Sequence, residues 1–449
     1  MNPLVTEIFF NDPWWIVAIK GIGIVILLLT WTIVNVWYER RLLGKMQNRI
    51  GPIMNGPFGL GQTLGDGLKF LLKEDFAPGM VDKVLFTLAP LIAGTCAFTA
   101  WAVIPLAGEV DMFGVHTRLQ VTDLPVGALV ILAASSVAIY GFVLAGWSSN
   151  SPYSLLGALR SSAQMVSYEI SMGLSFVAVF LYAGTMSTSD IVDGQAVGLL
   201  GQPFLGNFGL QNWYWLVLFP SFVVYVISMI GETNRAPFDL PECESELVSG
   251  HLTEYTGFRY AIYYLAEYIN VVTVSAVCTT LFFGGYHAFW PFAMIPGMDS
   301  GWWGLLWFVI KCQIGFSFFV WLRASLPRFR YDQFMDLGWK WMIPFSLLWL
   351  MGVATMRGLK NAELLTPVVI LGIGAVVVLG LVAWSLGGKD EEPAPVDTGA
   401  PFDAFAGGYP VPPMPGQTLP ELAGVVTSTT EAEQTSTEDA VAAASGGEK

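Results

Sequence analysis

The chain has 449 residues, of which 54% are hydrophobic and only 12% are charged. A soluble domain of average composition carries about 25% charged residues. The low charged share therefore excludes an ordinary soluble protein and indicates a chain surrounded by lipid. The formal net charge is −14 and the sequence contains no dense Lys/Arg cluster, so we expect no nucleic-acid partner.

Apolar runs of about 20 residues, the length that crosses the hydrocarbon core of a bilayer, recur along the chain. Trp and Tyr mark many of their ends, as is usual at membrane interfaces. The pattern predicts an all-α, polytopic transmembrane helix bundle over residues 1–386. We expect about nine spans, at Trp14–Trp37, Val84–Leu106, Pro125–Trp147, Ala163–Ala183, Trp213–Gly231, Tyr260–Phe283, Trp303–Val320, Trp339–Met356 and Thr366–Leu386.

The distribution of Lys and Arg predicts the orientation of the bundle, because cytoplasmic loops carry an excess of both residues. The loops after odd-numbered spans hold most of them, whereas the even-numbered loops hold Arg118, Arg357 and Lys360. We therefore expect the N-terminus outside and the C-terminus in the cytoplasm. Residues 387–449 are acidic and rich in Pro, Ala, Gly, Ser and Thr, which predicts a disordered cytoplasmic tail.

The four cysteines, at positions 96, 243, 278 and 312, are far apart and form no C-x-x-C pair. An iron–sulfur cluster or a structural zinc ion needs about four ligands held close together. The three histidines are equally scattered. We therefore expect no metal or redox centre within this chain.

The first cytoplasmic loop mixes basic residues with acidic ones. Positive-inside topology explains Lys45, Lys73 and Lys83 but not the acidic Glu39 and Asp66 among them. Four leucines at helical spacing follow a Gly-Pro break, and they are Leu60, Leu64, Leu68 and Leu71. We expect an amphipathic helix there, lying in the membrane surface.

The loop after the fifth predicted span sets six acidic residues against one basic residue, Arg235. The acidic residues are Glu232, Asp239, Glu242, Glu244, Glu246 and Glu254. Asp239 and Glu242 also fit a capping-box pattern, which is a purely structural alternative for that pair. It does not explain Glu246, because like charges four residues apart on a helix repel. Crowded carboxylates raise the pKa of some members, so the loop is typical of a proton relay or a charge-sensitive switch.

Two more acidic residues, Glu169 and Glu267, lie inside predicted spans. An ionised carboxylate at the bilayer centre costs about 2.5–3.5 kcal/mol, so such residues usually face a polar interior or a water-filled path. The alternative for both is a position at the membrane boundary. Lys311 in the seventh span is a candidate partner.

The loop after the seventh span carries Arg328, Arg330 and Asp332 around Tyr331. These residues either set topology or clamp a neighbouring acidic loop or a partner subunit. We favour a structural or docking role.

These loops together resemble one family closely. The chain reads ERRLLGKMQNRIGP from Glu39, ETNRAPFDLPECESELVSG from Glu232 and PRFRYDQFMDLGWK from Pro327. In these stretches it is similar to the quinone-site membrane subunit (subunit 1 in mitochondria) of respiratory complex I, the type I NADH:quinone oxidoreductase. Residues 14–356 carry the resemblance. The chain departs from the pattern at Gly61, Thr63 and Gly65, where relatives often carry Leu, Pro and Ala.

The resemblance implies that the cytoplasmic loops dock under the hydrophilic arm of the complex and form a tunnel that admits ubiquinone or menaquinone as substrate. The position matching Arg40 lines that tunnel, and we extend this role to Glu39, Arg49 and Asp66. Electrons would reach the quinone through iron–sulfur clusters held by partner chains. We therefore expect a non-redox subunit, inactive alone, in the inner (plasma) membrane of a bacterium.

The resemblance also implies an acidic path toward the antiporter-like membrane subunits, with Arg235 paired to its members. These would be Glu169, Glu232, Asp239, Glu242, Glu246 and Glu267, to which we add Glu244 and Glu254. Two alternatives are retained. The membrane subunit of a membrane-bound hydrogenase would tend to carry a DNP-x-THLEL-like stretch after the fifth span, and a stand-alone proton or cation transporter would work without partners in detergent.

Overall fold

The computed structural model describes residues 12–196, 213–239, 248–289 and 301–362, together with Phe292, Ile295, Gly297 and Met298. Contacts divide the chain into the units Met1–Thr366 and Pro367–Lys449, and all described residues belong to the first unit. The ninth predicted span, the predicted acidic tail and the boundary between them lie outside the described residues.

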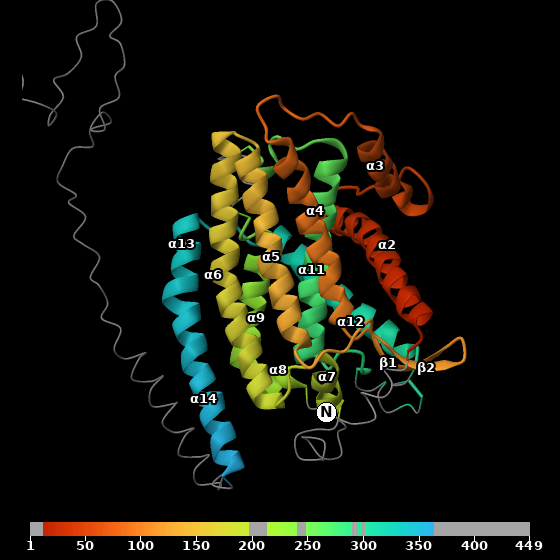
Figure 1. Cartoon of the computed structure of the whole chain (residues 1–449), viewed down its shortest axis with the longest axis vertical. Helices are drawn as coiled ribbons and strands as arrows, with labels where there is room; N and C mark the ends of the chain where they lie inside the picture. Colours follow the sequence, from red (N-terminus) through yellow and green to blue (C-terminus); the bar gives the residue numbers. More distant parts are fainter. Residues whose placement is uncertain are drawn as a thin grey trace, which may run out of the picture. The chain divides into compact units, whose positions relative to one another are not determined.

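Each of the first eight predicted spans corresponds to a helical segment (Figure 1). In the described part of the chain, seven segments are long and apolar enough to cross a bilayer. They are α2 (Trp14–Met46), α4 (Lys83–Thr99) with the 3₁₀ turn η2 (Ala100–Val103), α5 (Gly127–Ser148), α6 (Pro152–Ala183), α11 (Gly257–Phe282), α12 (Trp303–Ser325), and the run of α13 (Tyr331–Asp336), the π-helical η6 (Leu337–Met342) and α14 (Ile343–Asn361). The eighth, α9 (Phe219–Glu232), is shorter and follows the single-turn α8 (Tyr214–Val217). The prediction of a polytopic helical bundle is confirmed.

Three helices extend beyond the predicted spans. The 33 residues of α2 reach about 50 Å at 1.5 Å per residue, well over the ~30 Å hydrocarbon core. The helix α6 begins at Pro152 rather than Ala163, which places Arg160 on a helix instead of in a loop. The last run begins at Tyr331 rather than Trp339. Hydropathy marks only the lipid-crossing part of a helix, so polar extensions at its ends are not detected.

The helix α11 forms the centre of the bundle. Its most apolar window is 83% buried, and it packs against α2, α4, α9 and α12. Small residues permit this close packing: a Cβ added at Gly315 of α12 would lie 3.0 Å from the Ser275 side chain of α11. The helix α6 packs against α5, α9 and α14 on the other side.

A β-hairpin departs from the all-α prediction. Its strands β1 (Ala107–Met112) and β2 (Val115–Leu119) pair antiparallel, with Val110 opposite Thr117. The two residues between them, Phe113 and Gly114, have φ values of 51° and 82°, as a type I′ hairpin turn requires. The hairpin lies at one end of the bundle, with the short α7 (Thr188–Ala196) (Figure 1).

Short helical elements occupy the opposite end of the bundle (Figure 1). They are η1 (Pro57–Gly59), α3 (Gly61–Leu72) and η4 (Gly250–Leu252). The expected amphipathic helix after Pro57 is therefore present as α3, and its leucines at positions 64, 68 and 71 are exposed. Gly61 begins this helix because a Cβ there would lie 2.8 Å from the Asn55 carbonyl oxygen.

Candidate functional site

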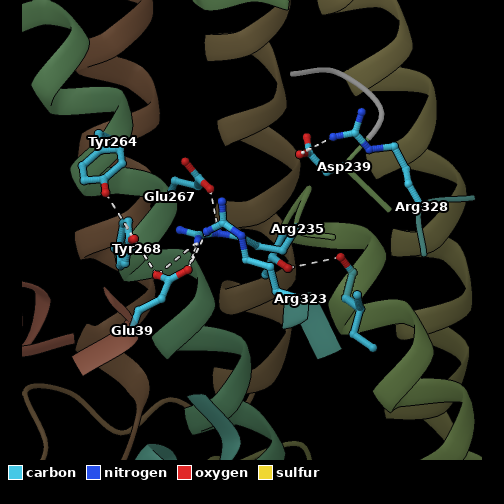
Figure 2. Close-up of polar contacts among 10 residues, drawn as sticks. Glu39, Arg235, Asp239, Tyr264, Glu267, Tyr268, Arg323 and Arg328 are labelled. Atoms are coloured by element: carbon cyan, nitrogen blue, oxygen red, sulfur yellow. Dashed lines mark hydrogen bonds and ion pairs between the residues drawn. The ribbon is translucent and has the colours of Figure 1, made fainter. Parts of the chain in front are cut away.

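Three helices and one loop bring buried charges together (Figure 2). Glu39 on α2 accepts hydrogen bonds from Arg323 of α12 at 2.5 Å and from the Tyr268 hydroxyl of α11 at 2.6 Å. Nη1 of Arg235, in the loop after α9, lies 3.3 Å from the same carboxylate. Nε of Arg235 pairs with Glu267 of α11 at 2.7 Å. We call these five residues the Arg235 network.

Arg235 joins the two carboxylates of the network. Its side chain is 11% exposed, and its guanidinium carbon lies 4.4 Å from the centre of the Tyr268 ring. Burial alone lowers the pKa of an arginine, but Glu267, Tyr268 and Glu39 outweigh this effect and hold the pKa of Arg235 well above its ordinary value. The guanidinium is therefore a fixed positive charge that two acidic residues share.

A cavity of about 70 Å³ extends from the Arg235 network into the bundle. Glu267 lines it, and so does Glu232 at the end of α9. Three buried atoms of lining residues have no hydrogen-bond partner in the described structure: Glu232 Oε2, Asn234 Oδ1 and His251 Nδ1. Buried polar atoms are nearly always satisfied, and one water needs roughly 10–15 Å³. The cavity therefore has the size and polarity to hold several water molecules.

Glu169 of α6 approaches the same cavity from the side of α5. Its carboxylate accepts hydrogen bonds from Ser135 at 2.9 Å and from the neighbouring Ser136. Ser135 lines the cavity, and Glu169 acts electrostatically on Glu232. Glu169, Glu232 and Glu267, which the sequence places on separate elements, thus gather around one cavity.

The next residue of α2, Arg40, faces away from the network and toward α3. Its Nη1 lies 2.7 Å from Asp66 of α3, and the two side chains are 44% and 23% exposed. Gln62 donates to the other oxygen of Asp66 at 3.2 Å. Arg49, predicted for the same site, instead donates to Gln47 at 2.7 Å and is exposed. The structure thus pairs Arg40 with Asp66 and leaves Arg49 outside this pair.

Two tyrosines of α11 lie between the Arg40–Asp66 pair and the Arg235 network (Figure 2). The Tyr264 hydroxyl donates to the Tyr268 hydroxyl at 3.2 Å, and Tyr268 donates to Glu39. Both tyrosines act electrostatically on Arg40. A chain of hydroxyls therefore leads from the half-exposed pair to the buried carboxylate.

The loop after α12 contacts the loop after α9. Arg328 pairs with Asp239 at 3.3 Å, and the Phe329 amide donates to the Pro237 carbonyl at 3.1 Å. Arg330 pairs with its neighbour Asp332 at 3.1 Å, and both side chains are more than 70% exposed. Of the predicted docking residues, Arg328 clamps the acidic loop, while Arg330 and Asp332 are accessible.

Some predicted residues do not join these contacts. Glu254 is half-buried in the turn after η4 and forms no ion pair with any described residue. Glu242, Glu244 and Glu246 lie outside the described residues. Lys311 donates to the carbonyl oxygens of Phe283 and Gly285 beyond the end of α11. It therefore lies about 25 Å along α11 from Glu267, so the suggested partnership was wrong.

Sequence reasoning missed several residues of the site. Arg323 indicates only topology in the sequence, and Tyr268 and Tyr264 were not predicted. The signal for both tyrosines is a polar run, YYLAEYIN, inside an apolar span. The adjacent Ser135 and Ser136 in an apolar helix are a similar signal. Within the described ranges, no group of three or more His, Cys, Asp or Glu residues is arranged to hold a metal ion.

Comparison with known proteins gives consistent matches over nearly the whole chain. A family model described as NADH dehydrogenase matches residues 19–354, which include every member of the Arg235 network. The NADH-quinone oxidoreductase component designated H from Cutibacterium acnes is 57% identical over 435 residues, covering 96% of this chain and 97% of that protein. The protein of the same name from Streptomyces avermitilis is 49% identical over 425 residues, covering 93% and 90%.

Proposed function

Because this chain belongs to the NADH dehydrogenase family, with relatives that are a membrane subunit of the NADH-quinone oxidoreductase known as complex I, we propose that it forms the quinone-binding tunnel of that complex. We further propose that its acidic residues couple quinone reduction to proton translocation. One observation carries the proposal: the Arg235 network adjoins a cavity that Glu232 and Glu267 line.

The Arg40–Asp66 pair is the proposed contact with the quinone headgroup. Reduction adds two electrons, supplied by iron–sulfur clusters in partner chains, and the product takes up two protons. A guanidinium that is 44% exposed can stabilise the negative charge that develops on the quinone oxygens. Asp66 fixes the direction of Arg40, and the hydroxyls of Tyr264 and Tyr268 connect this position to Glu39.

The Arg235 network is the proposed charge sensor. At an effective dielectric constant of about 20, a new unit charge roughly 10 Å away is worth ~1.7 kcal/mol, more than one pKa unit. A negative charge on the quinone therefore favours proton uptake by the nearest carboxylates. Arg235 can then strengthen its contact with either Glu39 or Glu267, and the cavity waters offer the proton a route to Glu232 and Glu169.

The Lys and Arg distribution supports an orientation with the Arg40–Asp66 end in the cytoplasm, where the cluster-bearing hydrophilic arm would dock. Arg330 and Asp332 are accessible for that contact. The antiporter-like membrane subunits would receive the coupled protons. On this proposal the chain is inert alone, and co-purification of the other subunits in mild detergent tests the point.

The central experiment compares Arg40→Gln and Glu232→Gln in the intact complex. NADH oxidation is measured with a quinone and with ferricyanide, which accepts electrons before the quinone site, and proton translocation is measured in vesicles. We expect Arg40→Gln to lower the quinone rate at least ~10-fold, a loss of ~1.4 kcal/mol. Glu232→Gln should lower both quinone turnover and translocation. Ferricyanide rates should stay normal.

Two control variants match these changes in charge. Lys45→Gln removes an exposed cation from the last turn of the same α2, and Glu109→Gln removes an exposed acid from β1 at the opposite end. Both should keep normal quinone rates. If Arg40→Gln and Glu232→Gln also keep the normal ratio of quinone to ferricyanide activity, the proposal is wrong.

A further inference from the structure

Gln164 of α6 holds both ends of the segment that carries Glu232 and Arg235. Its side chain is fully buried. Its amide nitrogen donates to the carbonyl oxygens of Gly231 at 2.8 Å and Phe238 at 2.9 Å. Both partners are acceptors only, so the orientation of the amide is fixed by its surroundings. We call residues 231–238 the Arg235 loop.

Two more residues on the same face of α6 support the Arg235 loop. Ser161 accepts a hydrogen bond from Asn234 at 3.2 Å. The Tyr168 ring packs so closely against Gly231 that a Cβ there would lie 2.8 Å from it. Positions 161, 164 and 168 share one helical face. The helix therefore presents a continuous template to the loop.

The Arg235 loop has few contacts of its own that would fix its shape. Within it, the Phe238 amide donates to the Arg235 carbonyl at 2.9 Å. Asn234 has a φ of 50°, a left-handed conformation that asparagine tolerates but does not favour. The position of the Arg235 guanidinium thus depends on the anchors that α6 supplies at both ends.

We propose that Gln164 is a positioning residue for Arg235: by tying Gly231 to Phe238 it sets the placement of the guanidinium between Glu39 and Glu267. This inference rests on the proposed function of the Arg235 network. Loss of the two hydrogen bonds would let the loop move relative to α11. A shift of about 1 Å in a reacting geometry can lower a rate up to ~100-fold.

The test is Gln164→Met, which keeps the approximate shape of the side chain and removes both donors. Gln195→Met is the matched control. Gln195 is also fully buried, donates to the Thr280 carbonyl at 2.9 Å and accepts from the Gly284 amide at 2.9 Å, near the other end of α11. Both variants lose buried hydrogen bonds, but only the first one loosens the Arg235 loop.

The readouts are kcat and KM for the quinone, and the ferricyanide rate, per intact complex. We expect Gln164→Met to lower kcat about tenfold with KM changed less than about twofold, because the quinone contact at Arg40 and Asp66 is untouched. The ferricyanide rate should be unchanged. Gln195→Met should keep kcat within about twofold of the native value. A purely structural role for Gln164 would instead lower the amount of complex without this selective fall in kcat.

A third variant, Arg235→Lys, separates the two ways to fail. If it loses quinone turnover while Gln164→Met behaves like Gln195→Met, the positioning role is overturned and the proposed function stands. If Arg235→Lys also retains native turnover, the proposed function itself fails. Should Gln164→Met not assemble, Ser161→Ala decides: a threefold or larger fall in kcat, of the order that a lost anchor costs, supports the inference, and native kcat overturns it.

Discussion

Two buried ionic contacts lie near opposite ends of α2, and they differ in connectivity. Near the start of the helix, Lys20 contacts Asp12 at 2.6 Å, and both side chains are at most 3% exposed. The Thr117 hydroxyl bridges them, accepting from Lys20 at 2.6 Å and donating to Asp12 at 2.7 Å. Near the other end, Glu39 meets two arginines, and Arg235 meets two carboxylates.

The comparison separates a structural ion pair from one suited to respond. A pair of one acid and one base cannot change without losing its only ionic contact, which strongly destabilises a buried site. In the Arg235 network each central charge has a second partner, so one contact can weaken while another strengthens. Arg323 is also 46% exposed, so an outside charge can act on it. The distinction is connectivity and access rather than depth of burial.

The largest expected effect comes from removing the central cation at each end. Arg235→Met and Lys20→Met each leave buried carboxylate uncompensated, at a cost of about 3–5 kcal/mol. Both should reduce the amount of assembled complex, measured by native electrophoresis. Only Arg235→Met should also abolish quinone turnover per assembled complex. Equal loss of turnover per complex in Lys20→Met would remove the distinction.

A second, intermediate effect is expected from filling the cavity beside the Arg235 network. Ala134 lines this cavity, and Ala134→Leu would displace water at an overpacking cost of about 1–3 kcal/mol. We expect proton translocation in vesicles to fall several-fold. Ala134→Ser, which is small and polar, should leave it unchanged. Native translocation in a stably assembled Ala134→Leu complex would show that the cavity is not part of the route.

A smaller effect on stability accompanies a change at the half-exposed Asp66. Exposed ion pairs contribute about 0–1 kcal/mol, so Asp66→Asn should leave thermal stability nearly unchanged while raising KM for the quinone several-fold. Asp336→Asn is the matched control, because Asp336 forms an exposed pair with Lys340 at 2.7 Å. If both variants keep the native KM, Asp66 has no part in quinone binding.

The smallest expected effect concerns pH. Burial lowers the pKa of His251 from 6.5 to about 4. The unfolded chain therefore binds this proton more readily, and stability falls as pH decreases from about 6.5 toward 4. At pH 5.5 the cost is ~1 kcal/mol. His251→Phe keeps the ring contacts with Phe142 and Tyr263 and should narrow the difference between melting temperatures of the complex at pH 7.5 and 5.5. An unchanged difference would contradict a buried, neutral imidazole.

Sequence reasoning located the spans because hydropathy is a local property, and it identified Arg235 because a lone base among acidic residues is unusual. It did not predict which charges meet. Arg323 and Glu39 are 284 positions apart, and their contact depends on how helices pack. One rule would have helped: consecutive spans alternate in direction, so a residue early in α12 lies near the end of α11. That rule places Lys311 far from Glu267 and Arg323 close to it.

The adjacency of Glu39 and Arg40 in α2 has a consequence of its own. Successive residues on a helix point about 100° apart, so one side chain turns inward to Arg235 while the next turns toward Asp66. A single helical wall thus separates two chemical compartments with no spacer between them. Insertion or deletion of one residue upstream in α2 would rotate this wall and exchange what each compartment sees, without altering any side chain that faces either.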